Sequence, residues 1–491
     1  MPSALAAVLV LLTSAAVLVL EIIANRLVAP YVGLTLETTT AAIGVALAGI
    51  AAGSALGGRL ADVVDPRRWL GLATALGGVL VLVARPTVLA LGPSVGGGAG
   101  ATIVLVTVAV LPAALVLTMV TPGVVKLRLR TLEETGATVG RLSATGTIGA
   151  LAGTFLTGFV LLSALPTSRV LLVVGLVLVV LGVVVAVVLP TGRAVDERPL
   201  LGLLLLMLLG SGWLVLADSS CDRETRYYCA RVVEDPDREG GRVLFLDSLR
   251  HSYVDLDDPR HLEFSYTQRI AAVLDAQPAG PLDALHLGLG GGTIPRYLAD
   301  TRPGSSSRVL EVDPGVVDLD RDALGLVTGP DLTVRVGDAR TSIADEPDDA
   351  YDVVVGDAFG SLAVPWHLAT REMAEDIARV LREDGVYVAN VIDNPPAAFV
   401  RAEVATLRAV FDEVLLVGTA GQADGGAGGN YVLVATDGAL DAAAVEALGA
   451  GREQPWTVTG TDDFAGDADV LTDDDAPVDQ LLTPYARVDR T

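Results

Sequence analysis

The sequence predicts a multi-span α-helical membrane domain, then a small β-domain, then a doubly wound α/β domain. Three observations predict this order. Long apolar segments fill residues 1–217, which hold only 12 of the 34 basic and 8 of the 59 acidic residues. Short strand-like segments follow, and from residue 284 onward strands and helices alternate. The expected domain ranges are 1–217, 218–278, 279–450 and an acidic C-terminal tail over 451–491.

Seven segments of the first domain are long enough to cross a bilayer as helices, which takes about 20 apolar residues. They cover about 4–23, 38–58, 69–92, 100–121, 142–165, 169–189 and 199–217. Small residues crowd several of them, as in "AAIGVALAGIAAGSALGG", which favours close helix packing in lipid. The start "MPSALAAVLV" lacks the basic region of a cleavable signal peptide. We therefore expect a multi-pass protein of the cell membrane.

Basic residues in the connecting loops predict the orientation of these segments. The loops after the odd-numbered segments hold two, Arg26 and Arg169. The loops after the even-numbered segments hold nine: Arg59, Arg67, Arg68, Lys126, Arg128, Arg130, Arg141, Arg193 and Arg198. This asymmetry predicts a cytoplasmic N-terminus and, after seven crossings, a soluble part outside.

Two cysteines, Cys221 and Cys229, follow the last apolar segment. In an oxidising compartment they could pair, whereas in the cytoplasm they would stay reduced thiols. The sequence leaves both states open.

The soluble part is strongly acidic. Residues 218–491 have a net charge of −29, against +4 for residues 1–217. This composition resembles that of halophilic proteins, in which carboxylates keep the surface hydrated at high salt. Such a surface repels nucleic acid, so no nucleic-acid partner is expected. No cluster of Cys and His has the spacing of metal ligands, so no metal is expected either.

The order of elements in the soluble part predicts its sheet. "YYCARVVED" and "RVLFLDSLRHSYVDL" indicate paired strands of the small β-domain. Strands are then expected at "ALHLGLG", "RVLEVD", "LTVRVGD", "YDVVVGD", "GVYVANVI", "EVLLVG" and "YVLVAT", with helices over 293–300, 314–324 and 365–383. This alternation is typical of a mostly parallel sheet, in which ligands bind at the carboxyl ends of the strands.

Candidate ligand-binding residues end four consecutive strands. Gly288, Gly290 and Gly292 form a turn that lets the backbone approach a ligand closely. Glu311 ends the next strand, where an acidic side chain accepts both hydroxyls of a ribose. Two further acids, Asp338 and Asp357, end the next two strands in chain order. Together they favour a nucleoside with an exocyclic amine over a dinucleotide.

These motifs give the chain a family resemblance. From about 222 to 436 it resembles the Rossmann-like class I S-adenosylmethionine (SAM)-dependent fold, and more closely the spermidine synthases, or polyamine aminopropyltransferases. The resemblance rests on "LDSLRHSYVDLDDPRHLEFSYTQ", the glycine turn, "LEVDPGVV", "VGDAR" and "YDVVVGDAF". Together with the apolar N-terminal segments, "VPWHLATREM" and "LTDDDAPVDQLL" are similar to the membrane-fused spermidine synthase-like proteins.

The resemblance implies a transferase of aminopropyltransferase type and a role for each matching residue. Gly288, Gly290 and Gly292 would lie under the methionine-derived part of the donor, which is SAM or decarboxylated SAM. Glu311 would bind the ribose, and Asp338 with Ala339 the adenine. Asp357 would contact and deprotonate the attacking amine. The weaker candidates for substrate binding are His251, Tyr266 and Gln268.

The chain departs from the family pattern at the diamine site. Gly291 stands where the spermidine synthases have an aspartate in the turn. Their Tyr-His-Glu is Tyr266-Thr267-Gln268 here, and their Gln-Ser is His251-Ser252. A second acid after Asp357 is replaced. His251 and His367 are candidates for replacement polar groups, or else structural histidines. The form of the donor therefore stays open.

Three functions remain as hypotheses. The first is transfer of an aminopropyl group to an amine acceptor, by a chain that could form a homodimer. The second is a SAM-dependent methyltransferase acting on a membrane-proximal acceptor. The third is a transporter or binding protein, because "GGRLADVVDPRR" also resembles the cytoplasmic loop motif of major facilitator transporters. The charge rule places the soluble part outside, whereas a cytosolic donor requires it inside, so its side stays unresolved.

Overall fold

A computed structural model describes residues 1–32, 36–95, 99–129, 131, 133–162, 165–189, 202, 210, 221–247, 249–360 and 364–483. The chain divides into two compact units, Met1–Ser220 and Cys221–Thr491. Each is described by itself below.

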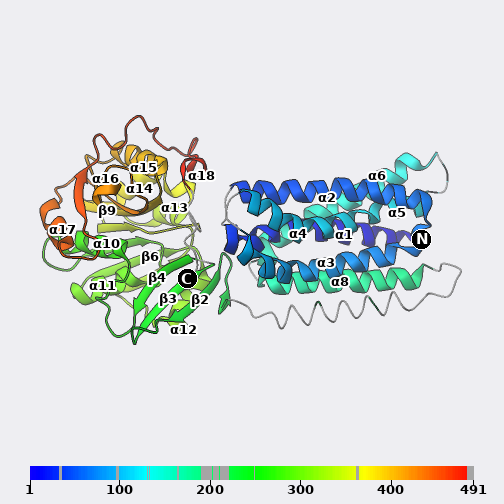
Figure 1. Ribbon diagram of the computed structural model, residues 1–491, viewed down its shortest axis with the longest axis horizontal. Helices are drawn as coiled ribbons and strands as arrows, with labels where there is room; N and C mark the ends of the chain where they lie inside the picture. The colour runs from blue at the N-terminus through cyan, green and yellow to red at the C-terminus, as the bar shows by residue number, and fades with distance from the viewer. Residues whose placement is uncertain are drawn as a thin grey trace. The chain divides into compact units, whose positions relative to one another are not determined.

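The first unit is a bundle of long apolar helices (Figure 1). Its elements are α1 (Ser3–Val32), α2 (Leu36–Val63), η1 (Pro66–Arg68), α3 (Leu70–Leu91), η2 (Gly92–Ser94), α4 (Ala99–Thr118), α5 (Val120–Arg128), α6 (Thr135–Leu156), the π-helical turn η3 (Thr157–Leu161) and α8 (Thr167–Val188). Six helical stretches of the described residues are long and apolar enough to cross a membrane. They match the first six predicted segments, and the seventh, 199–217, falls almost wholly outside the described residues.

Small residues bring these helices into close contact, as their density in the sequence predicts. A Cβ added at Gly53 in α2 would lie 2.2 Å from the carbonyl oxygen of Leu115 in α4. One added at Gly149 in α6 would lie 2.2 Å from the carbonyl oxygen of Leu11 in α1. Backbone packing this tight needs glycine, and in lipid such packing replaces the hydrophobic effect as a source of helix association.

The second unit begins with a small antiparallel sheet in the order β1-β2-β3-β4. Its strands are β1 (Arg223–Glu224), β2 (Cys229–Glu234), β3 (Gly241–Leu246) and β4 (Leu249–Asp255). Cys221 and Cys229 form a disulfide at the start of this sheet, with their Cα atoms 5.2 Å apart. The sheet packs apolar side chains against α12 (Pro314–Ala323). Ser252 and Val254 of its strand β4 lie beside Gly291.

The large sheet has eight strands in the order β12-β10-β11-β9-β8-β5-β6-β7. The strands are β5 (Asp283–Leu287), β6 (Ser306–Glu311), β7 (Leu332–Val336), β8 (Tyr351–Gly356), β9 (Leu381–Asp393), β10 (Glu413–Gly418), β11 (Gly429–Thr436) and β12 (Thr457–Gly460). Strands β9, β8, β5, β6 and β7 are parallel. Strands β11, β10 and β12 extend the sheet in antiparallel fashion. The doubly wound α/β fold is therefore present, with a mixed sheet.

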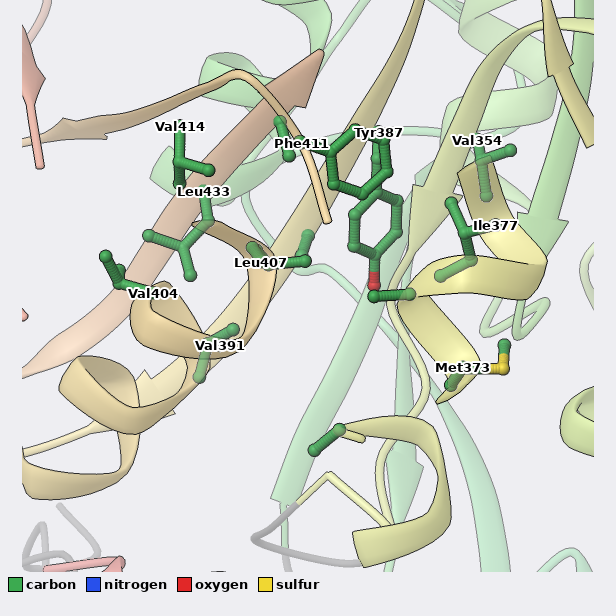
Figure 2. Close-up of a cluster of buried hydrophobic side chains, with 14 of the residues drawn as sticks. Val354, Met373, Ile377, Tyr387, Val391, Val404, Leu407, Phe411, Val414 and Leu433 are labelled. Carbon is green, nitrogen blue, oxygen red and sulfur yellow. The ribbon is translucent and has the colours of Figure 1, made fainter. Parts of the chain in front are cut away.

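Helices cover both faces of this sheet (Figure 1). They are α10 (Ser265–Asp275), α11 (Thr293–Thr301), α12 (Pro314–Ala323), α13 (Ala339–Ser342), η4 (Ile343–Asp345), η5 (Trp366–Leu368), α14 (Arg371–Val380), α15 (Ala398–Arg408), α16 (Ala420–Ala423), α17 (Ala442–Gly449) and α18 (Val478–Leu481). Strand residues alternate between the faces: Val353 and Val355 pack with α10 and α11, whereas Val354 packs with α14 and α15. Figure 2 shows the second cluster, where Tyr387 lies between Phe411 and Ile377.

Two segments differ in detail from the sequence prediction. The helix expected over 365–383 is shorter, because Thr370 caps α14 by accepting from the N–H of Met373 and Leu381 already pairs with Tyr351 in the sheet. Part of the segment expected as an acidic tail, 451–483, contributes β12 and buried side chains such as Phe464 and Leu471. This segment is therefore integrated into the α/β unit.

Candidate functional site

The glycine turn follows β5 and adopts backbone angles that suit glycine. The φ angles are +95° at Gly288, +53° at Gly290 and +71° at Gly292. A Cβ at Gly288 would lie 2.6 Å from the carbonyl oxygen of Asp357, the residue that follows β8. Positive φ and this close contact both exclude a larger residue at Gly288. The turn and the end of β8 therefore lie against each other, as parallel neighbouring strands require.

Glu311 ends β6 and ties it to the glycine turn. Its Oε2 accepts a hydrogen bond of 2.9 Å from the N–H of Leu289, and Oε1 accepts one of 2.8 Å from the N–H of Asp313. Burial raises the pKa of Glu311, and these backbone donors oppose that shift. A carboxylate can accept about four hydrogen bonds, so lone pairs remain for the two hydroxyls of a ribose.

Asp338 and Ala339 stand at the start of α13, after β7. The side chain of Asp338 caps this helix by accepting from the N–H of Arg340 at 2.9 Å. Its other oxygen lies 3.0 Å from Nε2 of His367 in η5. The side chain of Ala339 is buried in the core, so only its backbone can serve a ligand. Asp338 is thus a helix cap whose second oxygen already has one polar partner.

Asp357 is held by two neutral hydrogen-bond donors. The hydroxyl of Tyr266 in α10 donates to Oδ2 at 3.2 Å, and Nδ2 of Asn390 in β9 donates to Oδ1 at 2.8 Å. Burial raises the pKa of Asp357 to about 6, although both hydrogen bonds lower it. A carboxylate with this pKa is largely ionised at pH 7 and accepts a proton more readily than an exposed one.

A further polar chain supports Asn390 and was not foreseen from the sequence. Nδ2 of Asn430 donates to Oδ1 of Asn390 at 2.9 Å. The buried Arg269 donates from NH1 to the carbonyl oxygen of Asn430 at 2.9 Å and to Oε1 of Gln422 at 3.1 Å. The asparagine within the apolar strand "YVANVI" is the one signal that could have revealed this chain.

Of the three weaker candidates for substrate binding, two lie at the site and the third is used elsewhere. Tyr266 lies in the site through its contact with Asp357. His251 lies beside the turn: its Nδ1 is buried without a hydrogen-bond partner, 3.9 Å from where a Cβ on Gly290 would be. Its ring meets that of Phe359 edge to face, with centroids 6.4 Å apart, and burial lowers its pKa to about 4. Gln268 instead donates to the carbonyl oxygen of Leu262 at 2.7 Å, so the structure uses its amide within the preceding loop.

The residues present fit an S-adenosyl compound. Glycines at Gly288 and Gly290 leave these two positions of the turn free of side chains, and the buried Nδ1 of His251, which has no hydrogen-bond partner, lies 3.9 Å from the Cβ position of Gly290. Within the described residues, no group of three His, Cys, Asp or Glu side chains is arranged to hold a metal ion. The site is therefore built from a bare turn, strand-end carboxylates and neutral donors.

Comparisons with known proteins show what the chain is similar to. No family model matches the chain. Over 163 residues the chain is 34% identical to a polyamine aminopropyltransferase of Vibrio vulnificus. This match covers 33% of this chain and 53% of that protein. The chain is thus similar to polyamine aminopropyltransferases over part of its length. The curated relatives carry the name of the transferase class that the sequence predicted.

Another relative carries the name of a methyltransferase. The chain is 26% identical over 124 residues to an eEF1A lysine and N-terminal methyltransferase of Xenopus laevis, and the match covers 23% of this chain and 18% of that protein. A solved structure of a probable spermidine synthase from Corynebacterium glutamicum is 28% identical, with a TM-score of 0.49, and covers 53% of this chain and 98% of that one. The chain spans about half the length of the first polyamine aminopropyltransferases it matches.

Proposed function

We propose that the chain is a membrane-bound transferase that moves an aminopropyl-type group from an S-adenosyl sulfonium donor to an amine acceptor. The observation that carries this proposal is the environment of Asp357. The backbone carbonyl of Asp357 lies against Gly288, and its carboxylate accepts from Tyr266 and Asn390 and has a pKa of about 6. The names of the curated relatives support the same class of reaction.

For this reaction the protein has to position the acceptor amine and accept the proton that it loses. The sulfonium supplies an activated carbon: the amine nitrogen forms a bond to it, the carbon–sulfur bond breaks, and its electron pair goes to sulfur. Asp357 holds the amine in line for attack and takes the proton that the nitrogen loses. Tyr266 and Asn390 fix the direction of the carboxylate, since each occupies one of its oxygens.

The other strand ends would hold the donor. Glu311 would bind the ribose hydroxyls, and Asp338 with the backbone of Ala339 would bind the adenine edge. The bare turn at Gly288 and Gly290 would pass under the sulfonium tail. These roles use positions at the carboxyl ends of parallel strands, where ligands of this fold bind.

The helical unit would anchor the enzyme in a bilayer. Six stretches of the described residues have the length and composition of membrane spans, and many of their apolar side chains are exposed, such as Phe159, Val187 and Leu151. Exposed apolar surface of this extent suits contact with lipid. The acceptor would then be an amine that reaches the membrane surface.

The test is transfer by the full chain and its Asp357→Asn variant. Asparagine keeps the shape and cannot accept the proton, so we expect kcat/KM to fall about 10²- to 10⁴-fold. Binding of S-adenosylhomocysteine should change less than about threefold. Asp384→Asn, at an exposed carboxylate, is the matched control. Undiminished transfer by Asp357→Asn would refute the role of Asp357.

A methyltransferase is the second candidate, because two of the curated relatives carry that name. The mass of the product decides between the two. A donor labelled in its methyl group gives a labelled acceptor only in the second case. A binding protein or transporter predicts no modified acceptor with either donor.

A further inference from the structure

The residues around the turn discriminate between two forms of the donor tail. A decarboxylated tail ends in an ammonium group alone, with a net positive charge. A tail that keeps its carboxylate is a zwitterion and has no net charge. The two forms need different partners, because a desolvated lone charge is costly unless a group of opposite charge lies beside it.

No carboxylate can stand at Gly291 in the packing observed. A Cβ there would lie 2.8 Å from Cγ2 of Val254, 3.1 Å from Oγ of Ser252 and 3.3 Å from Cδ1 of Leu324. Strand β4 thus covers this position with a methyl group and a hydroxyl. An ammonium group over Gly291 would have apolar and neutral neighbours.

The hydroxyl groups beside Gly291 are already committed. Oγ1 of Thr293 donates to the carbonyl oxygen of Tyr253 at 2.8 Å. Because that bond uses its one proton, Oγ of Ser252 must be the donor in the 3.0 Å bond between the two hydroxyls. The side chains beside Gly291 are therefore fixed by this hydrogen-bond chain and carry no negative charge.

Donors for an anion are present instead. Within the described residues, the N–H groups of Gly290 and Gly291 make no hydrogen bond. Nδ1 of His251, buried and unpartnered, lies 3.9 Å from the Cβ position of Gly290. The ring is neutral near pH 7, and its nitrogen donates to a carboxylate oxygen when it carries the proton. Three donors thus lie at or beside Gly290 and Gly291, and none of the side chains in contact with Gly291 is an acid.

We infer that the site selects an S-adenosyl donor that retains its carboxylate, with His251 as the residue that recognises it. This inference rests on the proposed function, because it assumes that the turn holds an S-adenosyl compound. The bond exchange is then unchanged, but the group carried to the amine is 3-amino-3-carboxypropyl, leaving methylthioadenosine, or methyl, leaving S-adenosylhomocysteine.

The test compares two ligands that differ only in the carboxylate. S-adenosylhomocysteine and its decarboxylated form, S-adenosyl-3-thiopropylamine, are titrated into the full chain. We expect the first to bind about tenfold more tightly or better. His251→Phe should reduce that ratio to about twofold by weakening only the first ligand. His261→Phe is the matched control, since His261 lies before α10 and pairs with Glu263.

A second variant makes space for an aspartate at position 291. Val254→Ala with Gly291→Asp removes the methyl group that blocks a side chain at 291, and should shift preference at least tenfold toward the decarboxylated ligand. Equal binding of both ligands by the unmodified chain, or tighter binding of the decarboxylated one, would overturn the inference and leave the proposed function standing. If neither ligand binds, the proposed function fails as well.

Discussion

At the scale of single residues, the proton affinity of Asp357 follows from what surrounds it. Within the described residues its carboxylate accepts from Tyr266 and Asn390, and no cation forms an ion pair with it. Neutral donors lower a carboxylate pKa less than a charge does, so burial prevails and the pKa rises to about 6. The same burial leaves His251 neutral. Desolvation is therefore the main cause of the pKa shifts of both Asp357 and His251.

The pH dependence of transfer tests this explanation. The reaction needs ionised Asp357, so kcat/KM should rise with pH through about 6. Asn390→Ala removes a hydrogen bond that lowers this pKa, so the midpoint should move to higher pH. Gln277→Ala, whose amide donates to the carbonyl oxygen of Val273, is the control. An unchanged midpoint in Asn390→Ala would show that another group governs the profile.

The sequence predicts the functional residues at the strand ends, but not the side chains that form hydrogen bonds with them. Glu311, Asp338 and Asp357 could be placed because parallel strands end at one edge of a sheet. The contact between Asn390 and Asn430 could not, because β9 and β11 run antiparallel to each other and this pairing cannot be read from spacing. Nor could Gln268 be recognised as a loop contact, since its partner is a backbone carbonyl.

At the scale of elements, the junction between the glycine turn and β8 is the tightest point of the site. Gly288→Ala combines a positive φ, which costs about 1–2 kcal/mol in a residue with a Cβ, with a clash against Asp357. Gly304→Ala is the matched control: its φ is +91°, close to the +95° of Gly288, and its nearest neighbour would be 3.6 Å away.

Both variants should lower the free energy of unfolding of the full chain, measured by denaturant titration. Gly288→Ala should lose more stability than Gly304→Ala, and it alone should weaken binding of S-adenosylhomocysteine. Equal losses in the two variants would mean that the turn yields to the added methyl group without disturbing β8.

Helix α15 carries a buried carboxyl group that sets a pH limit on stability. Oε2 of Glu403 has no hydrogen-bond partner, and burial raises the pKa of this group from 4.5 to about 8. A raised pKa means that the protonated form favours folding. The contribution is complete below about pH 4.5 and is lost as pH rises through about 8.

Glu403→Gln should therefore stabilise the chain at high pH only. We expect a gain on the order of 1–3 kcal/mol at pH 9 and almost none at pH 4, measured by thermal unfolding at both values. Glu413→Gln, at an exposed position, should show no such gain. A gain of equal size at both pH values would contradict the assigned cause.

At the scale of the whole molecule, the disulfide bears on which side of a membrane the second unit would occupy. Cys221 and Cys229 are bonded, and disulfides persist mainly in oxidising compartments. The loop charges of nine against two would also place the second unit outside if residues 199–217 form a seventh crossing. A donor made in the cytoplasm would then have to reach the outer face.

Thiol labelling in intact cells measures the side. With a membrane-impermeant maleimide, we expect both cysteines to stay unlabelled until a reductant is added, and then to be labelled from outside. A Cys221→Ser variant, which frees Cys229, should be labelled without reduction. Thiols that react only after the cells are opened, with no reductant, would place the unit in the cytoplasm.

The coarse architecture was predictable because each part has its own periodicity. Apolar runs of about 20 residues indicated the first six helices, and alternating strands and helices indicated the sheet. Strands β10 and β11 were predicted, but their antiparallel pairing was not. The end of α14 at Val380 was not predictable either, because strand pairing overrides the helical pattern that continues through Leu381 and Arg382.

Equilibrium binding of S-adenosylhomocysteine to the full chain, measured by calorimetric titration, tests most directly whether the site holds an S-adenosyl compound. We predict saturable binding with one ligand per chain. Glu311→Gln should weaken it about tenfold or more, because the amide can accept at only one atom where the carboxylate accepts at two. Glu413→Gln should bind as the unmodified chain does. Absence of saturable binding at millimolar ligand, in a chain shown to be folded, would contradict the account.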